Sequence, residues 1–156
     1  MNLKEYWEKR AEMSLKSVGQ KSYSEELNRM ETEILFDTLS KEVGVFLNGK
    51  RILDIGCGIG RVLSFYSNFS NDIFGVDFSQ NMLDICRNNV PSAKLVNGDA
   101  SNLPFKSNSF DLVSAFVVLQ HIIDDGKREC VIKEMIRVTK PNGIIVINEE
   151  IKKVLK

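Results

Sequence analysis

The sequence predicts an α/β fold of the Rossmann-like type, with a doubly wound, mostly parallel sheet in three layers, α/β/α. Short apolar runs bounded by turn residues alternate with helical patterns from residue 51 onward. A glycine-rich loop joins the first apolar run to the first of these helices. Because a helix must cross over between parallel strands, this alternation covers both faces of the sheet. The 156 residues, 43% of them hydrophobic, suffice for one core.

A long helix is expected before the sheet. Ser22 and Glu25 have the spacing of a capping box, and Asn48-Gly49 ends the pattern. Apolar residues recur between them every three or four positions, at Leu27, Met30, Ile34, Leu35 and Leu39. We predict a single domain over residues 1–156, with a helical preface at 1–48 and the Rossmann-like core at 49–156.

Within the core we expect five strands and three helices. The strands are predicted at residues 51–55, 73–76, 93–96, 111–114 and 144–147. The helices are predicted at residues 62–69, 79–88 and 126–139. The last helix is ended by the Lys140-Pro141-Asn142-Gly143 turn.

Composition argues against several classes of partner. The 21 lysines and arginines balance the 21 aspartates and glutamates, so no net field draws the chain to nucleic acid or to an anionic membrane. The three cysteines have neither disulfide-framework nor zinc spacing, so we expect no metal. The sequence shows no signal-peptide core and no apolar run near the ~20 residues of a membrane span. We expect a reduced, cytoplasmic protein.

The loop Ile52 to Arg61, ILDIGCGIGR, carries the main functional signal. Gly56, Gly58 and Gly60 follow a strand and precede a helix, where glycines let a ligand approach the backbone. The alternative is a tight turn without a ligand. In the dinucleotide fingerprint GxGxxG the third glycine comes one position later than Gly60 does here. Asp54, just before the first glycine, repels a pyrophosphate and favours an ammonium or sulfonium, which makes an NAD-dependent oxidoreductase the least favoured hypothesis.

The run from Asp54 to Gly60 resembles the DxGxGxG motif of class I S-adenosylmethionine-dependent methyltransferases. Three later segments are similar to the second, third and fourth motifs of that family, namely Gly75 to Ser79, Gly98-Asp99-Ala100 with Leu103-Pro104-Phe105, and Ser109 to Val113. The resemblance implies S-adenosylmethionine as the cofactor and methyl transfer as the reaction.

The segment after the fourth predicted strand bears on the acceptor. Ser114 to Val117 lacks both the Asn/Asp-Pro-Pro-Tyr/Phe motif of amino-methylating nucleic-acid enzymes and a Pro-Cys nucleophile. Leu119 to Ile122 looks like the small-molecule, methyltransferase type 11 branch of the family, which includes enzymes of quinone biosynthesis. The resemblance thus implies a small-molecule acceptor whose identity stays open.

The resemblance also assigns roles to acidic residues at the strand ends. Asp77 is expected to accept hydrogen bonds from the ribose hydroxyls; its alternative role is a helix cap or turn residue before Ser79. Asp99 is expected to bind the adenine amino group, with the N–H of Ala100 on a ring nitrogen; the alternative is plain turn chemistry.

Several further candidates have a structural alternative. Phe78 and Met82 are candidates to cover adenine or to pack in the core. Arg61 is a candidate for the cofactor carboxylate, or a solvated first-turn residue. Tyr6 and Trp7 lie in an amphipathic stretch, Leu3 to Leu15, that is similar to the lid of such enzymes but is also compatible with a docked helix. The complete predicted cofactor site is Tyr6, Asp54, Gly56, Cys57, Gly58, Arg61, Asp77, Phe78, Met82, Asp99, Ala100 and Phe116.

Methyl transfer from a sulfonium is an in-line displacement, so alignment matters more than acid or base groups. His121, the single histidine, is the candidate base if the acceptor must lose a proton. A structural histidine hydrogen-bonded to backbone is the alternative. Asp124 and Asp125 are interpreted as N-cap residues of the next helix.

The resemblance to this family implies a seven-stranded sheet, whereas we can place only five strands in this sequence. We therefore expect the domain to be C-terminally short. The fifth, Gly143 to Asn148, is apolar and forms an exposed edge, which natural proteins pair, cover or charge. We expect either a truncated chain or a sheet completed by self-association or by a partner. The rival to an enzyme is accordingly a non-catalytic S-adenosylmethionine-binding module completed in that way.

Overall fold

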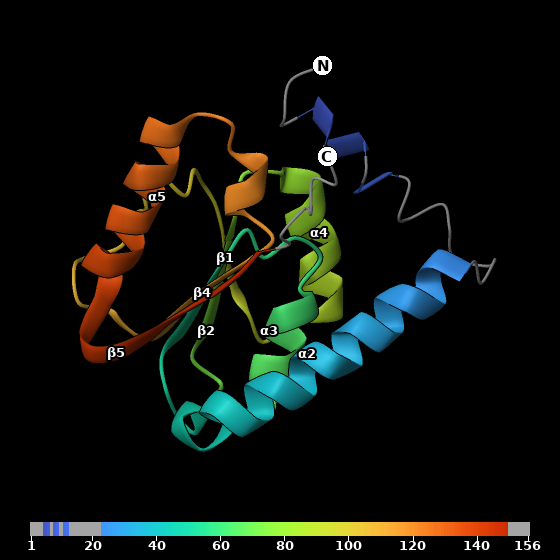
Figure 1. Cartoon of the computed structure of the whole chain (residues 1–156), viewed down its shortest axis with the longest axis horizontal. Helices are drawn as coiled ribbons and strands as arrows, with labels where there is room; N and C mark the ends of the chain where they lie inside the picture. Colours follow the sequence, from blue (N-terminus) through green and yellow to red (C-terminus); the bar gives the residue numbers. More distant parts are fainter. Residues whose placement is uncertain (1–4, 7, 10, 13–22, 150–156) are drawn as a thin grey trace, which may run out of the picture.

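The computed structural model describes residues 5–6, 8–9, 11–12 and 23–149, with the backbone alone for 23–28 (Figure 1). Residues 5–6, 8–9 and 11–12 are helical. The elements that follow are α2 (Tyr23–Leu47), β1 (Ile52–Ile55), α3 (Arg61–Tyr66), β2 (Ile73–Asp77), α4 (Gln80–Asn89), β3 (Lys94–Asn97), β4 (Phe110–Phe116), η1 (Leu119–His121), α5 (Asp125–Val138) and β5 (Thr139–Asn148).

The five strands form one sheet in the order β3-β2-β1-β4-β5, and every pair is parallel. Strand β1 lies in the centre, with all four residues buried. Its Asp54 stands beside Gly75 of β2 and Ser114 of β4. Because all strands run the same way, their carboxyl ends meet at one edge of the sheet, where ligands bind in such folds.

Both faces of the sheet are covered, as predicted. One apolar cluster joins β1 and β2 to residues of α2, α3 and α4, and a second joins the opposite face to α5 and to Leu103 and Phe105 of the β3–β4 connection. In Figure 1, α5 lies on one side of the sheet and α2, α3 and α4 lie on the other. The expected three layers are therefore confirmed.

The predicted helices are confirmed with small shifts at their ends. Ser79 is the N-cap of α4, and its hydroxyl accepts a hydrogen bond from the N–H of Met82. Asp124 is the N-cap of α5, as expected, and accepts from the N–H of Lys127. Helix α3 ends at Tyr66 rather than at Phe69. The side chain of Asn68 donates to the carbonyls of the last turn, an alternative to continuing the helix.

Strand β5 is the edge of the sheet among the described residues, because it pairs with β4 alone. Its register shifts near the start, where Thr139 pairs with Phe110 but Ile144 pairs with Leu112. The Lys140 to Gly143 turn therefore lies inside this strand as an irregularity. Ile145 and Ile147 are 36% and 45% exposed, in keeping with the exposed edge expected from the sequence.

None of the helices in the described part of the chain is both long enough and apolar enough to cross a bilayer.

Candidate functional site

The glycine loop bends over the carboxyl end of β2. Its three alternate glycines all have positive φ, 65° at Gly56, 52° at Gly58 and 89° at Gly60, a region that other residues rarely adopt. The N–H groups of Gly56 and Cys57 both donate to the carbonyl of Val76, at 2.7 and 3.1 Å. These bonds hold the loop to the neighbouring strand.

The three glycines differ in what a side chain would meet. A Cβ at Gly56 would lie 2.5 Å from a methyl group of Val118, and one at Gly60 would lie 2.7 Å from the sulfur of Cys86. A Cβ at Gly58 would meet no described atom within 4 Å. Gly56 and Gly60 thus allow close packing inside the protein, whereas Gly58 faces open space in which a ligand can approach the backbone.

Asp77 ties this loop to the start of α4. One carboxylate oxygen accepts from the N–H of Gly58 and the other from the N–H of Ser79, both at 2.9 Å. The residue is 7% exposed; burial raises its pKa, and the two N–H groups counteract that effect. A carboxylate oxygen can accept more than one bond, so this turn role leaves room for the predicted bonds to ligand hydroxyls.

Asp54 is a second buried carboxylate next to the loop. It is 2% exposed and accepts a hydrogen bond of 2.7 Å from the hydroxyl of Ser114. Burial raises its pKa from 3.8 to about 7, although the Ser114 bond and the Arg61 charge lower it; the nearby charge of Asp77 raises it further. A cationic ligand would stabilise the ionised form, as the charge argument from the sequence requires.

The third predicted carboxylate, Asp99, already has partners within the chain. Lys127 of α5 donates to it at 2.8 Å, and the N–H and hydroxyl of Ser101 donate at 2.9 and 2.8 Å. Burial would raise the pKa of Asp99, but the bonds from Lys127 and Ser101 lower it below its usual value. A ligand amino group at this position would share the carboxylate with Lys127.

The side chain of Cys57 does not face the open side of the loop. It is 5% exposed and belongs to the core under the loop, where a Cβ on Gly75 would lie 2.7 Å from its sulfur. A hydrogen bond with the Cys86 thiol, together with burial, raises the pKa of Cys57. Cys57 therefore presents no thiolate to a ligand, and its backbone N–H and carbonyl are already bonded to the carbonyl of Val76 and to the N–H of Gly60.

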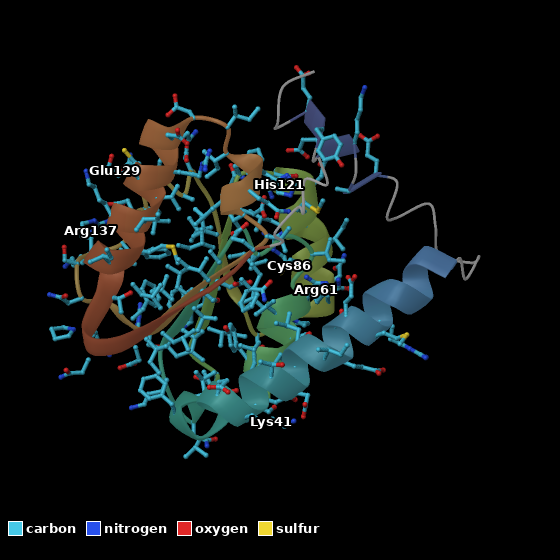
Figure 2. The ribbon with its side chains drawn as sticks, viewed as in Figure 1. Lys41, Arg61, Cys86, His121, Glu129 and Arg137 are labelled. Carbon is cyan, nitrogen blue, oxygen red and sulfur yellow. The ribbon has the colours of Figure 1, made fainter. Side chains whose placement is uncertain are left out.

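The remaining predicted cofactor residues differ in exposure. Met82 and Phe116 are buried, at 6% and 9%, while Tyr6 is 39% exposed. Phe78 and Ala100 are half-buried. Arg61 is exposed at the start of α3 (Figure 2). Their roles toward a cofactor stay predictions.

The predicted lid is described in part. Glu8 accepts hydrogen bonds from the N–H groups of Gln80 and Asn81, at 3.1 and 3.2 Å. The first helical residues of the chain thus dock at the start of α4, immediately after the turn made by Asp77. Trp7 lies outside the described residues, and closure of the segment over a cofactor stays a prediction.

His121 lies in η1, beyond the end of β4 (Figure 2). Its backbone N–H donates to the carbonyl of Val118 at 3.1 Å. Its ring Nε2 lies 3.5 Å from the side-chain nitrogen of Gln120. This position beside the predicted site is compatible with both roles considered for it, a base and a structural histidine.

Sequence reasoning did not single out four residues that the structure brings to the site. Their contacts join distant segments: Ser114 with Asp54, Val118 with Gly56, Lys127 with Asp99, and Glu149 with the N–H groups after β4. Ser114 had a detectable signal, because it is a polar residue inside an apolar strand. The other three had none, since their partners are set by the packing of separate elements. Among the described residues there is no group of three or more histidine, cysteine or acidic side chains arranged to hold a metal ion.

With this geometry in place, comparison with known proteins identifies the family. Residues 53–147, more than half of the chain, match the methyltransferase domain family. The chain belongs to this family. The match includes the glycine loop, Asp77 and Asp99, and it confirms the family predicted from the sequence motifs. It also supports S-adenosylmethionine as the cofactor.

The relatives of this methyltransferase domain include demethylmenaquinone methyltransferases. It is 37% identical over 101 residues to a demethylmenaquinone methyltransferase of Paenarthrobacter aurescens, an overlap of 65% of this chain and 39% of that protein. It is 39% identical over 115 residues to the demethylmenaquinone methyltransferase of Staphylococcus aureus, covering 70% and 46%. The chain thus spans less than half the length of these relatives.

A solved structure supports the same fold. The methyltransferase domain superposes on the PH0226 protein of Pyrococcus horikoshii with a TM-score of 0.69 and 27% identity. The superposition covers 84% of this chain and 59% of that one. The predicted Rossmann-like class is confirmed by this likeness together with the parallel sheet.

Proposed function

We propose that this methyltransferase domain binds S-adenosylmethionine and transfers its methyl group to a small-molecule acceptor. The observation that carries the proposal is the position of Gly58. Its open side lies in a loop whose two flanking acidic residues, Asp54 and Asp77, are both buried. Two buried carboxylates beside an accessible backbone favour a ligand that carries positive charge and hydroxyl groups.

The residues present fit such a cofactor. Asp77 has spare lone pairs for hydroxyl donors, and Asp54 has a pKa near neutrality, so that a cation would ionise it fully. The cofactor would supply an activated methyl group, and the protein would supply alignment and exclusion of water. His121 stays the candidate to accept a proton from the acceptor when transfer requires one.

We take a demethylated menaquinone as the first acceptor to test. This choice is supported by the similarity to two demethylmenaquinone methyltransferases, which are 37% and 39% identical to this chain over the matched region. The match covers 39% and 46% of those proteins, so the proposed acceptor rests on similarity over less than half of their length.

A second candidate function is an S-adenosylmethionine-binding module without catalysis, completed by a partner or by a second copy. The observation that favours it is the β5 edge, where Ile145 and Ile147 are exposed. Exposed apolar edge strands are sites at which another chain can pair. A monomer by light scattering at micromolar concentration would count against a second copy.

Titration calorimetry with S-adenosylmethionine, S-adenosylhomocysteine and NAD tests both functions. Binding of the first two but not of NAD is the expected result, and no binding of either would reject both candidates. Transfer of a labelled methyl group to demethylmenaquinone, and to a metabolite extract, then separates the enzyme from the module. Binding without any transfer would favour the module.

A further inference from the structure

Glu149, the residue directly after β5, holds three consecutive backbone N–H groups. One carboxylate oxygen accepts from Val118 at 3.1 Å and from Leu119 at 2.9 Å, and the other accepts from Gln120 at 3.0 Å. These N–H groups begin η1, which follows β4. Hydrogen bonds from backbone N–H groups to a charged carboxylate are stronger than those between neutral groups. The end of β5 is thus joined to the segment that leaves β4.

The joined segment has a strained backbone. Val117 has a φ of +58°, which is a rare conformation for a β-branched residue. Its N–H donates to the carbonyl of Asn148 at 2.7 Å. Asn148 and Glu149, adjacent at the end of β5, therefore both hold the segment that leaves β4. Strained backbone persists where the surrounding contacts enforce it, and such places are frequent at functional sites.

The same segment presses on the glycine loop. The methyl group of Val118 occupies the space that a Cβ on Gly56 would need, at 2.5 Å. Val118 also packs against the core cluster that contains Leu53 and Ile55. A shift of the segment at residues 117–121 would therefore change what supports the first glycine of the loop.

We infer that Glu149 is a positioning residue for the cofactor loop. Its carboxylate fixes the segment at residues 117–121, and Val118 of that segment fixes Gly56. The effect on cofactor affinity rests on the proposed function, whereas the effect on the segment itself does not. A plain strand-end cap would stabilise the fold without changing cofactor affinity, which makes the two interpretations separable.

The test compares Glu149→Gln and Glu149→Ala with a matched control, Asp111→Asn. Asp111 is also a carboxylate that accepts from a backbone N–H, that of Arg51 at 2.9 Å, and it pairs with Lys140. It lies at the opposite end of β4. The measurements are hydrogen exchange of the amides at 118–120, the dissociation constant for S-adenosylmethionine by calorimetry, and the unfolding midpoint.

We expect exchange at 118–120 to rise by roughly tenfold or more in both Glu149 variants, and affinity to fall by roughly tenfold, with alanine the more severe. Glutamine keeps one acceptor oxygen, so it should rescue part of the loss. Asp111→Asn should lower the unfolding midpoint by about as much as Glu149→Gln does, but it should leave the affinity for S-adenosylmethionine unchanged.

Unchanged exchange at 118–120 in Glu149→Ala would overturn the inference. So would an affinity within about twofold of the unaltered protein in both Glu149 variants, or an equal loss in Asp111→Asn. Failure of the unaltered protein to bind S-adenosylmethionine would instead reject the proposed function, and exchange alone would then decide whether Glu149 holds the segment.

Discussion

The hydroxyl of Ser114 donates a hydrogen bond of 2.7 Å to the carboxylate of Asp54, and both residues are buried. They stand opposite one another on the neighbouring strands β4 and β1. A hydroxyl can donate to an ionised carboxylate or accept from a protonated one. The pair can therefore hold Asp54 in either protonation state next to the glycine loop, and pH is expected to affect both cofactor binding and stability.

Cofactor affinity should rise with pH through about 7. Burial raises the pKa of Asp54 to about 7, and the positive charges of S-adenosylmethionine favour its ionised form, so that binding releases a proton below this pH. Calorimetry from about pH 5.5 to about pH 8.5 checks the trend. Asp54→Asn should flatten it; an equally steep profile in that variant would assign the titration to another group.

Stability without cofactor should show the opposite trend for the same group. Because its pKa is raised on folding, Asp54 binds more protons in the folded protein than in the unfolded chain at pH values between 3.8 and about 7. The contribution of Asp54 to stability is therefore full below 3.8 and is lost as pH rises toward 7. In denaturant unfolding at several pH values, the free energy of unfolding of Asp54→Asn should increase relative to that of the unaltered protein as pH rises. The difference in unfolding free energy between the two proteins is the quantity to follow. Asp111 and Glu134 have lowered pKa values, so their contributions to the stability of both proteins are lost as pH falls.

Gly58→Ala should weaken cofactor binding far more than Gly49→Ala does. Both glycines have positive φ, 52° and 66°, and at neither would a Cβ meet a described atom within 4 Å. The cost in unfolding free energy should be similar, about 1 kcal/mol each. Only Gly58 lies in the glycine loop, so its variant should lose roughly tenfold or more in affinity by calorimetry. Equal affinities in the two variants would remove Gly58 from the site.

Asp77→Ala should weaken binding of S-adenosylmethionine by about 1–3 kcal/mol through lost charged hydrogen bonds. Part of this loss is indirect, because the carboxylate also holds the N–H of Gly58. Asp77→Asn keeps one acceptor oxygen and should lose less. Asp84→Ala, an exposed change on α4, serves as the control in the same titration. An affinity unaltered in Asp77→Ala would refute the ribose role.

Arg137→Ala should destabilise the fold by about 1–3 kcal/mol without acting on the loop directly. Its guanidinium, on α5 (Figure 2), donates to the carbonyls of Phe105 and Leu103 at 2.7 and 3.1 Å and pairs with Glu134. These bonds hold the β3–β4 connection against α5. Lys133→Ala removes an exposed ion pair on the same helix and should destabilise the fold much less than Arg137→Ala does. Chemical denaturation of both variants measures the contrast.

Local sequence patterns predicted most of the elements. The five apolar runs became the five strands, because each combines β-favouring residues with turn residues at its ends. Ser79 and Asp124 began their helices since capping depends on neighbours three residues away. Ends were less accurate where side chains competed with the helix, as Asn68 does after α3. The interruption inside β5 was not predicted, because the pairing of Thr139 with Phe110 depends on the neighbouring strand.

By itself, the sequence determined the Rossmann-like class, the place of the glycine loop and the acidic residues at the strand ends, because these depend on residues close together in the chain. Only the tertiary structure decided that Gly58 faces open space and that Lys127 already donates a hydrogen bond to Asp99. It also decided that Glu149 holds the segment at residues 117–121, which packs against Gly56. The Lys127–Asp99 and Glu149 contacts join residues 28 or more positions apart in the chain. They depend on strand order, register and helix packing, which no local pattern specifies.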